Sequence, residues 1–366
     1  MEKPQTIAEL ASMVRDTTGP IVPRGAGLHQ AIGNPAHPDS TVVDMRALNV
    51  VSDYIPSDLT ITVGAGMVLG DIQDILAVNR QWLPWDAPQH RHATIGGLLA
   101  SGLSGPLRHG AGAPRDWLLG MHFVTGDGRI IKSGGKVVKN VAGYDMHKLH
   151  IGALGTLGII AEVSFKLAPL PDADESITIT GMSIEHAHKI AYVLRKPPFN
   201  PSALLIEATP HHIRLWARWQ GAAAAVTRQV NIARARQPIA KPATAGSWDH
   251  LLNTPFSKSH GHAVQLRMGC APQSLESFYP ALQAIAPNAT FHIMPTVGLM
   301  RLYAPQMPDV AALRAALLPF GGYVVVEIGE DPMRWGPVPA NIAIMHQLKK
   351  AWDPDNKLNP GRYVIE

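Results

Sequence analysis

Apolar and polar positions in the first 170 residues follow short, changing periods that predict a mixture of helices and strands. An amphipathic run over residues 7–17, preceded by Thr6 as a candidate N-cap, predicts a helix. Short segments rich in β-branched residues predict strands. The Gly126-Asp127-Gly128 turn between two of them predicts a hairpin. The expected strands are residues 21–22, 41–45, 59–63, 122–125, 129–132 and 159–167, and a second helix is expected over residues 71–78.

The pattern changes at residues 169–174, a stretch rich in proline and aspartate. Beyond it, strands alternate with helices, which is typical of an antiparallel sheet covered by helices. We therefore expect an α+β fold with a first domain at 1–170, a smaller α+β cap domain with an antiparallel sheet at 171–340, and a tail at 341–366. The expected strands of the second domain are 176–180, 203–207, 213–218, 263–268 and 323–328, and its helices are 184–194, 222–236, 273–285 and 310–318.

Composition narrows the class of protein. The chain has 366 residues, 46% of them hydrophobic and only 16% charged, with 33 glycines and 31 prolines. Such a chain suits a compact protein of about two domains and does not suit a coiled coil or a disordered segment. Its single cysteine, Cys270, excludes a disulfide framework and a cysteine-ligated iron–sulfur or zinc site within this chain. Cys270 itself is interpreted as a small buried apolar residue.

The net charge of +4 is spread along the chain and does not form a basic patch. No run of lysine and arginine alternates with aromatic residues, so nucleic acid is not an expected partner. No apolar run reaches about 18 residues, and the first 16 residues lack the apolar core of a signal peptide. We expect a cytoplasmic protein, with peripheral attachment to the inner membrane through partner subunits as the alternative.

One glycine pair suggests a nicotinamide dinucleotide site. Gly64 and Gly66 follow an expected strand and precede an expected helix, as in dinucleotide-binding turns. However, Leu69 stands where the third glycine should be, and no strand ending in an acid follows about 20 residues on. The pair is interpreted as a structural strand–helix turn, with an NAD site as the remote alternative.

Three other glycine clusters favour a ligand site when they are taken together. Residues 23–27 (PRGAG), 94–102 (TIGGLLASG) and 152–160 (GALGTLGII) each offer a tight turn with backbone amides that can approach a ligand. Each cluster alone is more often a plain turn than a ligand site. Their order and their occurrence within one domain indicate a shared cofactor site.

In this order the clusters resemble the FAD-binding domain of the vanillyl-alcohol-oxidase/p-cresol-methylhydroxylase superfamily. Within it, the segment GGKVVKNVAGYDMHKLHIGALGTLGIIAEV at 134–163 resembles the FAD-binding subunit of bacterial glycolate oxidases. The tail DPDNKLNPGRY at 353–363 is similar to the closing motif of the family. The likeness is strong over residues 1–170 and holds only in outline for the middle domain.

The resemblance implies a p-cresol-methylhydroxylase-type domain of two subdomains with FAD bound non-covalently, because the family's covalent R-S-G-G-H motif is replaced here by PRGAG. Residues 23–28 and the second cluster would hold the diphosphate, the third cluster would line the adenine end, and Asn359 would reach the flavin edge. Arg24 and the backbone amides would balance the charge of the diphosphate. The implied cofactor-binding residues are Pro23, Arg24, Gly25, Ala26, Gly27, Leu28, Thr94, Gly96, Gly97, Ser101, Gly102, Arg108, Gly110, Gly155, Gly158, Ile159, Ile160 and Asn359.

The chain departs from the catalytic dehydrogenases of this superfamily in one respect. Their G-D-G-N-x-H stretch, which binds a divalent metal beside the flavin, does not occur here, so no metal site is expected. Oxidation of a 2-hydroxy acid needs a cation for the carboxylate and a base for the hydroxyl proton. Arg267 and Arg301 are the candidate cations, and the candidate bases are His262, His292 and Glu327.

Two functions follow from the resemblance. The first is an FAD-binding subunit of a glycolate-oxidase-type complex that oxidises glycolate or a similar short 2-hydroxy acid and passes electrons to a partner subunit or a quinone. The second is a flavin electron-relay or assembly subunit without turnover of its own. In both cases the expected partners are a catalytic flavoprotein paralogue and an iron–sulfur subunit.

Overall fold

The computed structural model describes residues 2–136, 143–244, 246–253 and 263–364. The chain divides into two compact units. Met1–Ser104, Ala113–Leu170 and Pro337–Glu366 make up the first, and Gly105–Gly112 and Pro171–Gly336 make up the second. The chain therefore leaves the first unit twice, briefly at residues 105–112 and again at residues 171–336, and returns to it each time.

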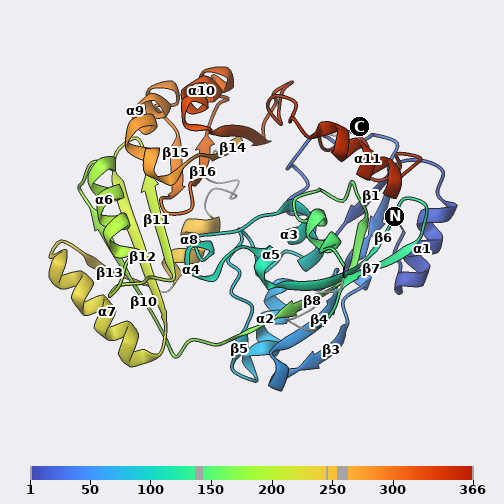
Figure 1. The fold of residues 1–366 in the computed structure, drawn as a ribbon, viewed down its shortest axis with the longest axis horizontal. Helices are drawn as coiled ribbons and strands as arrows, with labels where there is room; N and C mark the ends of the chain where they lie inside the picture. Colours follow the sequence, from blue (N-terminus) through green and yellow to red (C-terminus); the bar gives the residue numbers. More distant parts are fainter. Residues whose placement is uncertain (1, 137–142, 245, 254–262, 365–366) are drawn as a thin grey trace. The chain divides into compact units, whose positions relative to one another are not determined.

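The first unit is built on a five-stranded antiparallel sheet of order β3-β4-β8-β6-β7 (Figure 1). The central strand β4 is buried along its whole length, and β8 nearly so, because layers cover both faces of the sheet. Two small sheets, the parallel pair β1-β2 and the antiparallel pair β5-β9, lie outside it. The elements of this unit are α1 (Ile7–Asp16), β1 (Ile21–Arg24), β2 (Thr41–Asp44), β3 (Val51–Ile55), β4 (Thr60–Gly64), α2 (Leu69–Ala77), β5 (Gln81–Trp82), α3 (Ile95–Ser101), α5 (Pro114–Trp117), β6 (Leu118–Val124), β7 (Ile130–Gly134), β8 (Ile159–Lys166), β9 (Ala168–Pro169) and α11 (Ile342–Trp352).

Several local expectations for this unit are confirmed. Helix α1 begins after Thr6, whose hydroxyl accepts a hydrogen bond from the Glu9 amide at 3.1 Å. Its apolar face, including Leu10 and Val14, belongs to a buried cluster with residues of β1, β6 and β8. Strands β6 and β7 form the predicted hairpin around residues 126–128.

The second unit contains an eight-stranded sheet, antiparallel throughout, of order β13-β10-β12-β11-β15-β16-β14-β17. Helices α6, α7, α9 and α10 cover one face and bury its apolar side chains (Figure 1). By the alternation of side chains along β14, β16 and β17, Arg267, Arg301 and Glu327 lie on the opposite face, which we call the polar face. The elements are α4 (Arg108–Ala111), β10 (Ala173–Thr180), α6 (Ile184–Leu194), β11 (Ala203–Ala208), β12 (Ile213–Gly221), α7 (Ala223–Arg236), β13 (Lys241–Ala243), α8 (Gly246–Asn253), β14 (Val264–Gly269), α9 (Leu275–Ile285), β15 (Thr290–Met294), β16 (Leu299–Ala304), α10 (Val310–Leu317) and β17 (Tyr323–Ile328).

The α+β class predicted from the sequence is confirmed, but several details differ: β3, β13 and α8, for example, were not predicted. Strands β15 and β16 were not predicted, because β16 is buried at every position and so lacks the alternation that marks a strand. Residues 105–112, which the sequence pattern grouped with 1–170, pack within the second unit, where the Gly110 amide donates to the Ser202 carbonyl at 3.1 Å. No helix among the described residues is long and apolar enough to cross a membrane.

Candidate functional site

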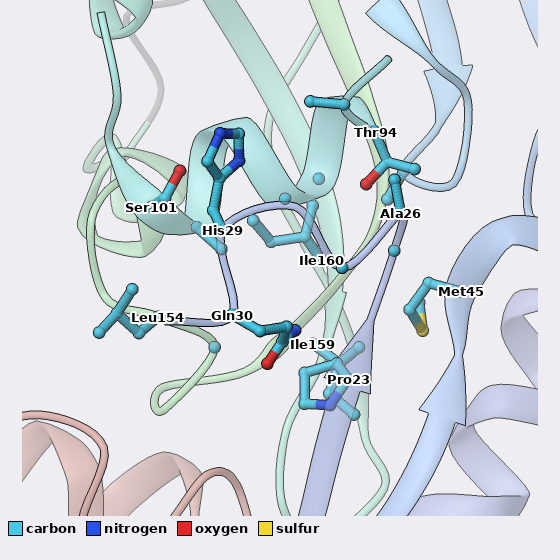
Figure 2. Close-up of a pocket in the computed structure, with 18 of the residues that line it drawn as sticks. Pro23, Ala26, His29, Gln30, Met45, Thr94, Ser101, Leu154, Ile159 and Ile160 are labelled. Carbon is cyan, nitrogen blue, oxygen red and sulfur yellow. The ribbon is translucent and has the colours of Figure 1, made fainter. Parts of the chain in front are cut away.

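A cavity in the first unit is lined by all three glycine clusters and by the C-terminal tail. It encloses about 770 Å³, including the part that is open to solvent. Figure 2 shows the loop after β1 curving past Thr94 and Ser101, with Ile159 and Ile160 of β8 on the same cavity. The cavity is lined by Pro23, Gly25, Ala26, Gly27, Leu28, His29, Gln30, Met45, Ala65, Ala93, Thr94, Gly96, Gly97, Ala100, Ser101, Leu154, Gly155, Gly158, Ile159, Ile160, Asn359 and Arg362.

The first glycine cluster approaches the second so closely that only glycine fits at one position. A Cβ atom added at Gly25 would collide with the Thr94 hydroxyl. Thr94 is buried and precedes helix α3 without capping it by a side-chain hydrogen bond. The absence of a side chain at Gly25 therefore leaves the backbone and this hydroxyl together at the cavity wall.

The second cluster is attached to the turn between β4 and α2. The amides of Ile95 and Gly96 donate to the carbonyls of Met67 and Ala65 at 2.8 and 2.9 Å. In the same turn, a Cβ at Gly64 or Gly66 would collide with backbone carbonyls of residues 45–48. These two glycines permit close backbone packing, which favours the structural interpretation of the pair over an NAD site.

The third cluster is joined to helix α3 by backbone hydrogen bonds. The amides of Gly152 and Leu154 donate to the carbonyls of Leu99 and Ala100 at 2.9 and 2.8 Å. Leu154 and Gly155 both have positive φ, at 53° and 72°. The chain therefore turns sharply at this point and enters β8 with Gly158 and Ile159 on the cavity.

The C-terminal tail adds a fourth wall. The Asn359 amide donates to the Ile21 carbonyl at 2.9 Å, so the tail lies beside β1 and the start of the first cluster. The Asn359 side chain is buried, and its Nδ2 donates to the Leu154 carbonyl at 2.7 Å. Its Oδ1 is buried and has no hydrogen-bond partner among the described residues. Because a buried acceptor without a donor is costly, this atom indicates a ligand that carries a donor.

A buried ion pair holds the tail in place. The Lys349 Nζ lies 2.5 Å from the Asp353 Oδ2 and also donates to the carbonyls of Thr156 and Leu358 at 3.0 and 2.9 Å. Burial lowers the pKa of Lys349, and the hydrogen bond and charge of Asp353 oppose that shift. The pair thus connects α11, the third cluster and the segment that carries Asn359.

Most of the predicted cofactor-binding residues line the cavity, and four do not. Arg24 is exposed and lies against Gly27 outside the lining. Gly102 ends α3 with a φ of 65° and packs on Gly152. Arg108 and Gly110 belong to α4 of the second unit, where a Cβ at Gly110 would press on Ser202.

The sequence interpretation missed several residues that line the cavity. His29 and Gln30 directly follow the first cluster, and Arg362 directly follows the Asn-Pro-Gly motif of the tail, so their positions were the only available indication. The others are small or apolar residues without a recognisable motif. The missed residues are His29, Gln30, Met45, Ala65, Ala93, Ala100, Leu154 and Arg362.

Four of the five candidate catalytic residues lie together on the polar face of the second unit's sheet. Arg301 is paired in register with His292 on one side and with Arg267 on the other. Glu327 reaches both arginines, with its carboxylate oxygens 3.1 Å from Arg267 Nε and 3.3 Å from Arg301 Nε. The fifth candidate, His262, lies outside the described residues.

The charges around Glu327 determine the protonation state of its carboxyl group. Burial raises the pKa of Glu327, but the charges of Arg301 and Arg267 and hydrogen bonds from Gln265 and Arg301 outweigh burial and lower it. Burial likewise lowers the pKa of Arg301, and Glu327 more than compensates. Glu327 is therefore an ionised counter-ion between two guanidinium groups and is a poor base at neutral pH. Of the candidate bases among the described residues, only His292 suits that role.

Among the described residues, no group of three or more histidine, cysteine, aspartate or glutamate side chains is placed to hold a metal ion. His211 and His212 sit in the exposed turn between β11 and β12, where the His212 ring lies 3.1 Å from the Thr209 hydroxyl. The cysteine, Cys270, is half-buried, and burial raises the pKa of its thiol to about 11.

Comparison with known proteins finds a family that matches much of the first unit and relatives that match half or nearly all of the chain. A family described as FAD binding domain matches residues 1–134. Glycolate oxidase subunit GlcE of Escherichia coli is 29% identical over 99% of this chain and 97% of that protein. Glycolate oxidase subunit GlcD of Bacillus subtilis is 30% identical over 50% of this chain but only 38% of its own length.

A solved structure of alkyldihydroxyacetonephosphate synthase superposes with a TM-score of 0.73 over 98% of this chain and 75% of that chain, at 17% identity. That likeness concerns the fold alone; together with the match to the FAD binding domain family it confirms the predicted α+β fold class. Together these comparisons confirm the resemblance stated from the sequence and confirm FAD as the cofactor.

Proposed function

Since this chain is an FAD-binding protein of the p-cresol-methylhydroxylase type that resembles glycolate oxidase subunits, we propose that it is the FAD-binding subunit of a glycolate-oxidase-type complex. In this proposal it oxidises glycolate or a similar short 2-hydroxy acid to the 2-oxo acid. The electrons pass to a partner subunit or to a quinone.

The observation that carries the proposal is the cavity of the first unit. Its lining fits FAD in three respects: glycine backbone that approaches the Thr94 hydroxyl, a buried Asn359 Oδ1 that lacks a donor, and apolar walls at Ile159 and Ile160. Residues 23–27 read PRGAG and hold no histidine of the family's covalent R-S-G-G-H motif. Acid denaturation should therefore release the flavin into solution.

The polar face of the second unit offers groups for a 2-hydroxy acid. Bound FAD would supply the acceptor for the two electrons that leave C2 of the substrate. A guanidinium binds a carboxylate through two parallel hydrogen bonds, and Arg267, whose side chain is 35% exposed, is accessible for this role. Arg301 is buried, so we assign it to holding Glu327 and shaping the face. His292 would accept the proton of the substrate hydroxyl.

The decisive experiment uses the isolated chain loaded with FAD under anaerobic conditions. Addition of glycolate or D-lactate should bleach the flavin absorbance band, and Arg267→Gln should raise the substrate concentration needed without loss of FAD. Glu330→Gln, an exposed site on the following loop, serves as the matched control. A chain that binds no FAD at all would contradict the proposal.

A second function is favoured by one observation. The sequence lacks the G-D-G-N-x-H stretch that binds a divalent metal in the catalytic dehydrogenases of this superfamily. We propose on this ground, as the alternative, that the chain is an electron-relay or assembly subunit for a catalytic paralogue. Flavin that stays oxidised in the isolated chain, but is bleached when a GlcD-like partner is present, would select this function.

The partners and the location belong to the same proposal. We infer a complex with a catalytic flavoprotein paralogue and an iron–sulfur subunit, in the cytoplasm or bound peripherally to the inner membrane through those subunits. Co-purification of a GlcD-like chain and an iron–sulfur chain with the tagged protein tests it, and a protein that purifies alone from its native host would count against it.

A further inference from the structure

Gly269 of β14 leaves room for the ring of Tyr323 on the neighbouring strand β17. The two residues are partners in the register of these strands. A Cβ atom added at Gly269 would overlap Tyr323 Cε1 and would lie 2.7 Å from Cζ, so the ring packs directly against the glycine backbone. Gly269 does not have a positive φ, so the backbone conformation alone does not require glycine here. The ring that covers this position accounts for the missing side chain.

The same ring lies beside the guanidinium of Arg267. Gly269 and Arg267 are two positions apart on β14, and side chains at such positions share one face of a sheet, which here is the polar face. The Arg267 Cζ lies 5.8 Å from the centre of the Tyr323 ring, within the range of a cation–π contact. Tyr323 is 45% exposed, so water only partly weakens this contact.

Arg267 is thus held by two different neighbours. Its Nε is buried and lies 3.1 Å from the Glu327 Oε1, while the Tyr323 ring covers the guanidinium. Its Nη groups donate no hydrogen bond to any described residue. A guanidinium in this state can bind a carboxylate through two parallel hydrogen bonds. Because binding normally costs an arginine its rotamer freedom, contacts that fix the side chain in advance increase the affinity.

We propose that Tyr323 is a positioning residue for the substrate carboxylate. Its ring, packed against Gly269, orders the Arg267 guanidinium before the acid binds. Tyr323 itself does not touch the reacting atoms. This inference rests on the proposed function, in which Arg267 binds the carboxylate of a 2-hydroxy acid, and it adds the residue that orients that arginine.

The experiment measures the Kd of glycolate and of D-lactate by calorimetry. It uses the FAD-loaded chain with its flavin reduced in advance, so that the acid binds without being oxidised. Tyr323→Leu should raise the Kd about two- to fivefold, which is the size expected for one partly exposed cation–π contact. Tyr323→Phe keeps the ring and should restore wild-type binding. Tyr192→Leu is the matched control, because Tyr192 is 39% exposed and its ring contacts Arg195, 3.7 Å away, on the helix-covered side of the sheet.

Kinetics of the oxidised chain distinguish positioning from a general structural effect. Tyr323→Leu should raise KM by the same factor and leave kcat unchanged, because neither His292 nor the flavin is altered. A loss of folded protein would instead lower the apparent kcat and leave KM unchanged.

Gly269→Ala displaces the ring without removing it. The ring is exposed enough to swing outward, so this variant should fold and should weaken binding as much as Tyr323→Leu does. When Tyr323→Leu is already present, no ring is left to displace, so adding Gly269→Ala should weaken binding no further. A wild-type Kd in Tyr323→Leu, or an equal additional loss in the double variant, would overturn the inference.

Failure of the proposed function would look different from failure of this inference. If the wild-type chain holds FAD but binds neither acid, the carboxylate site is rejected together with the role of Tyr323. If Arg267→Gln abolishes binding but Tyr323→Leu leaves it unchanged, the site is retained and only the role of Tyr323 is rejected.

Discussion

The buried pair between Lys349 and Asp353 should control the stability of the first unit, and Asp353→Asn tests this directly. The two side chains are 5% and 0% exposed, and they join helix α11 to the tail. The Asp353 carboxylate also accepts hydrogen bonds from the amides of Lys357 and Leu358 at 2.9 and 2.8 Å. The substitution keeps the size of the side chain and leaves the ammonium group buried without its counter-charge.

The magnitude follows from burial. Removing one partner of a buried ion pair costs about 3–5 kcal/mol. Burial already lowers the pKa of Lys349, and loss of Asp353 would lower it further, so release of the proton limits the cost to the lower end of that range. We expect the free energy of unfolding to fall by about 3 kcal/mol, which is a more than hundredfold change in the unfolding equilibrium.

The assay is urea unfolding of the apo-protein followed by tryptophan fluorescence. Asp145→Asn provides the matched control, because Asp145 forms a comparable pair with Lys148 in the same unit but is 54% exposed, and surface pairs contribute about 0–1 kcal/mol. The double variant Lys349→Met with Asp353→Asn should recover part of the loss, since no charge then remains buried. Equal effects of the buried and the exposed substitution would refute this reasoning.

Three further outcomes are expected. Gly25→Ala should strongly reduce FAD loading, because the added Cβ would collide with the Thr94 hydroxyl. Gly19→Ala is the control, because a Cβ there would meet no atom within 4 Å, and its FAD loading should be unchanged. Equal FAD loading of the two variants, measured by flavin absorbance, would contradict the close approach of Gly25 to Thr94. Burial lowers the pKa of His150 to about 3, so as pH falls below about 6.5 the unfolded state gains a proton that the folded state does not. Stability should therefore fall by up to about 1.4 kcal/mol per pH unit from this group between pH 6 and 4, and the slope should flatten in His150→Phe. Glu327→Gln should lower the free energy of unfolding by about 3–5 kcal/mol, because it leaves two arginines without their counter-ion, and a melting temperature equal to wild type would refute this.

The sequence was most informative where local chemistry alone decides the structure. The glycine clusters at 23–27, 94–102 and 152–160 marked the cavity walls, because tight backbone turns need glycine regardless of the rest of the fold. Helix α1 was equally predictable from its cap and its apolar face. These features could be predicted because they depend on residues that are close together in the sequence.

Features that depend on contacts between residues far apart in the sequence could not be predicted in this way. The meeting of Glu327 with Arg267 and Arg301 depends on the register of three strands that are far apart in sequence, so its role as a counter-ion was not evident from the chain. The same reason hid Arg362, which reaches the cavity only because the tail returns to β1. Arg108 was predicted to bind the cofactor because it is close in sequence to the second cluster. In the structure it belongs to the second unit, so closeness in sequence did not bring it to the cavity.

The return of the tail has a consequence for biosynthesis. The first unit is interrupted by residues 171–336, and its cavity needs Pro23 from one end of the chain and Asn359 from the other. A ribosome must therefore translate the whole inserted unit before the cofactor site can close. We therefore expect FAD to bind with its full affinity only after the tail has been synthesised and has packed beside β1.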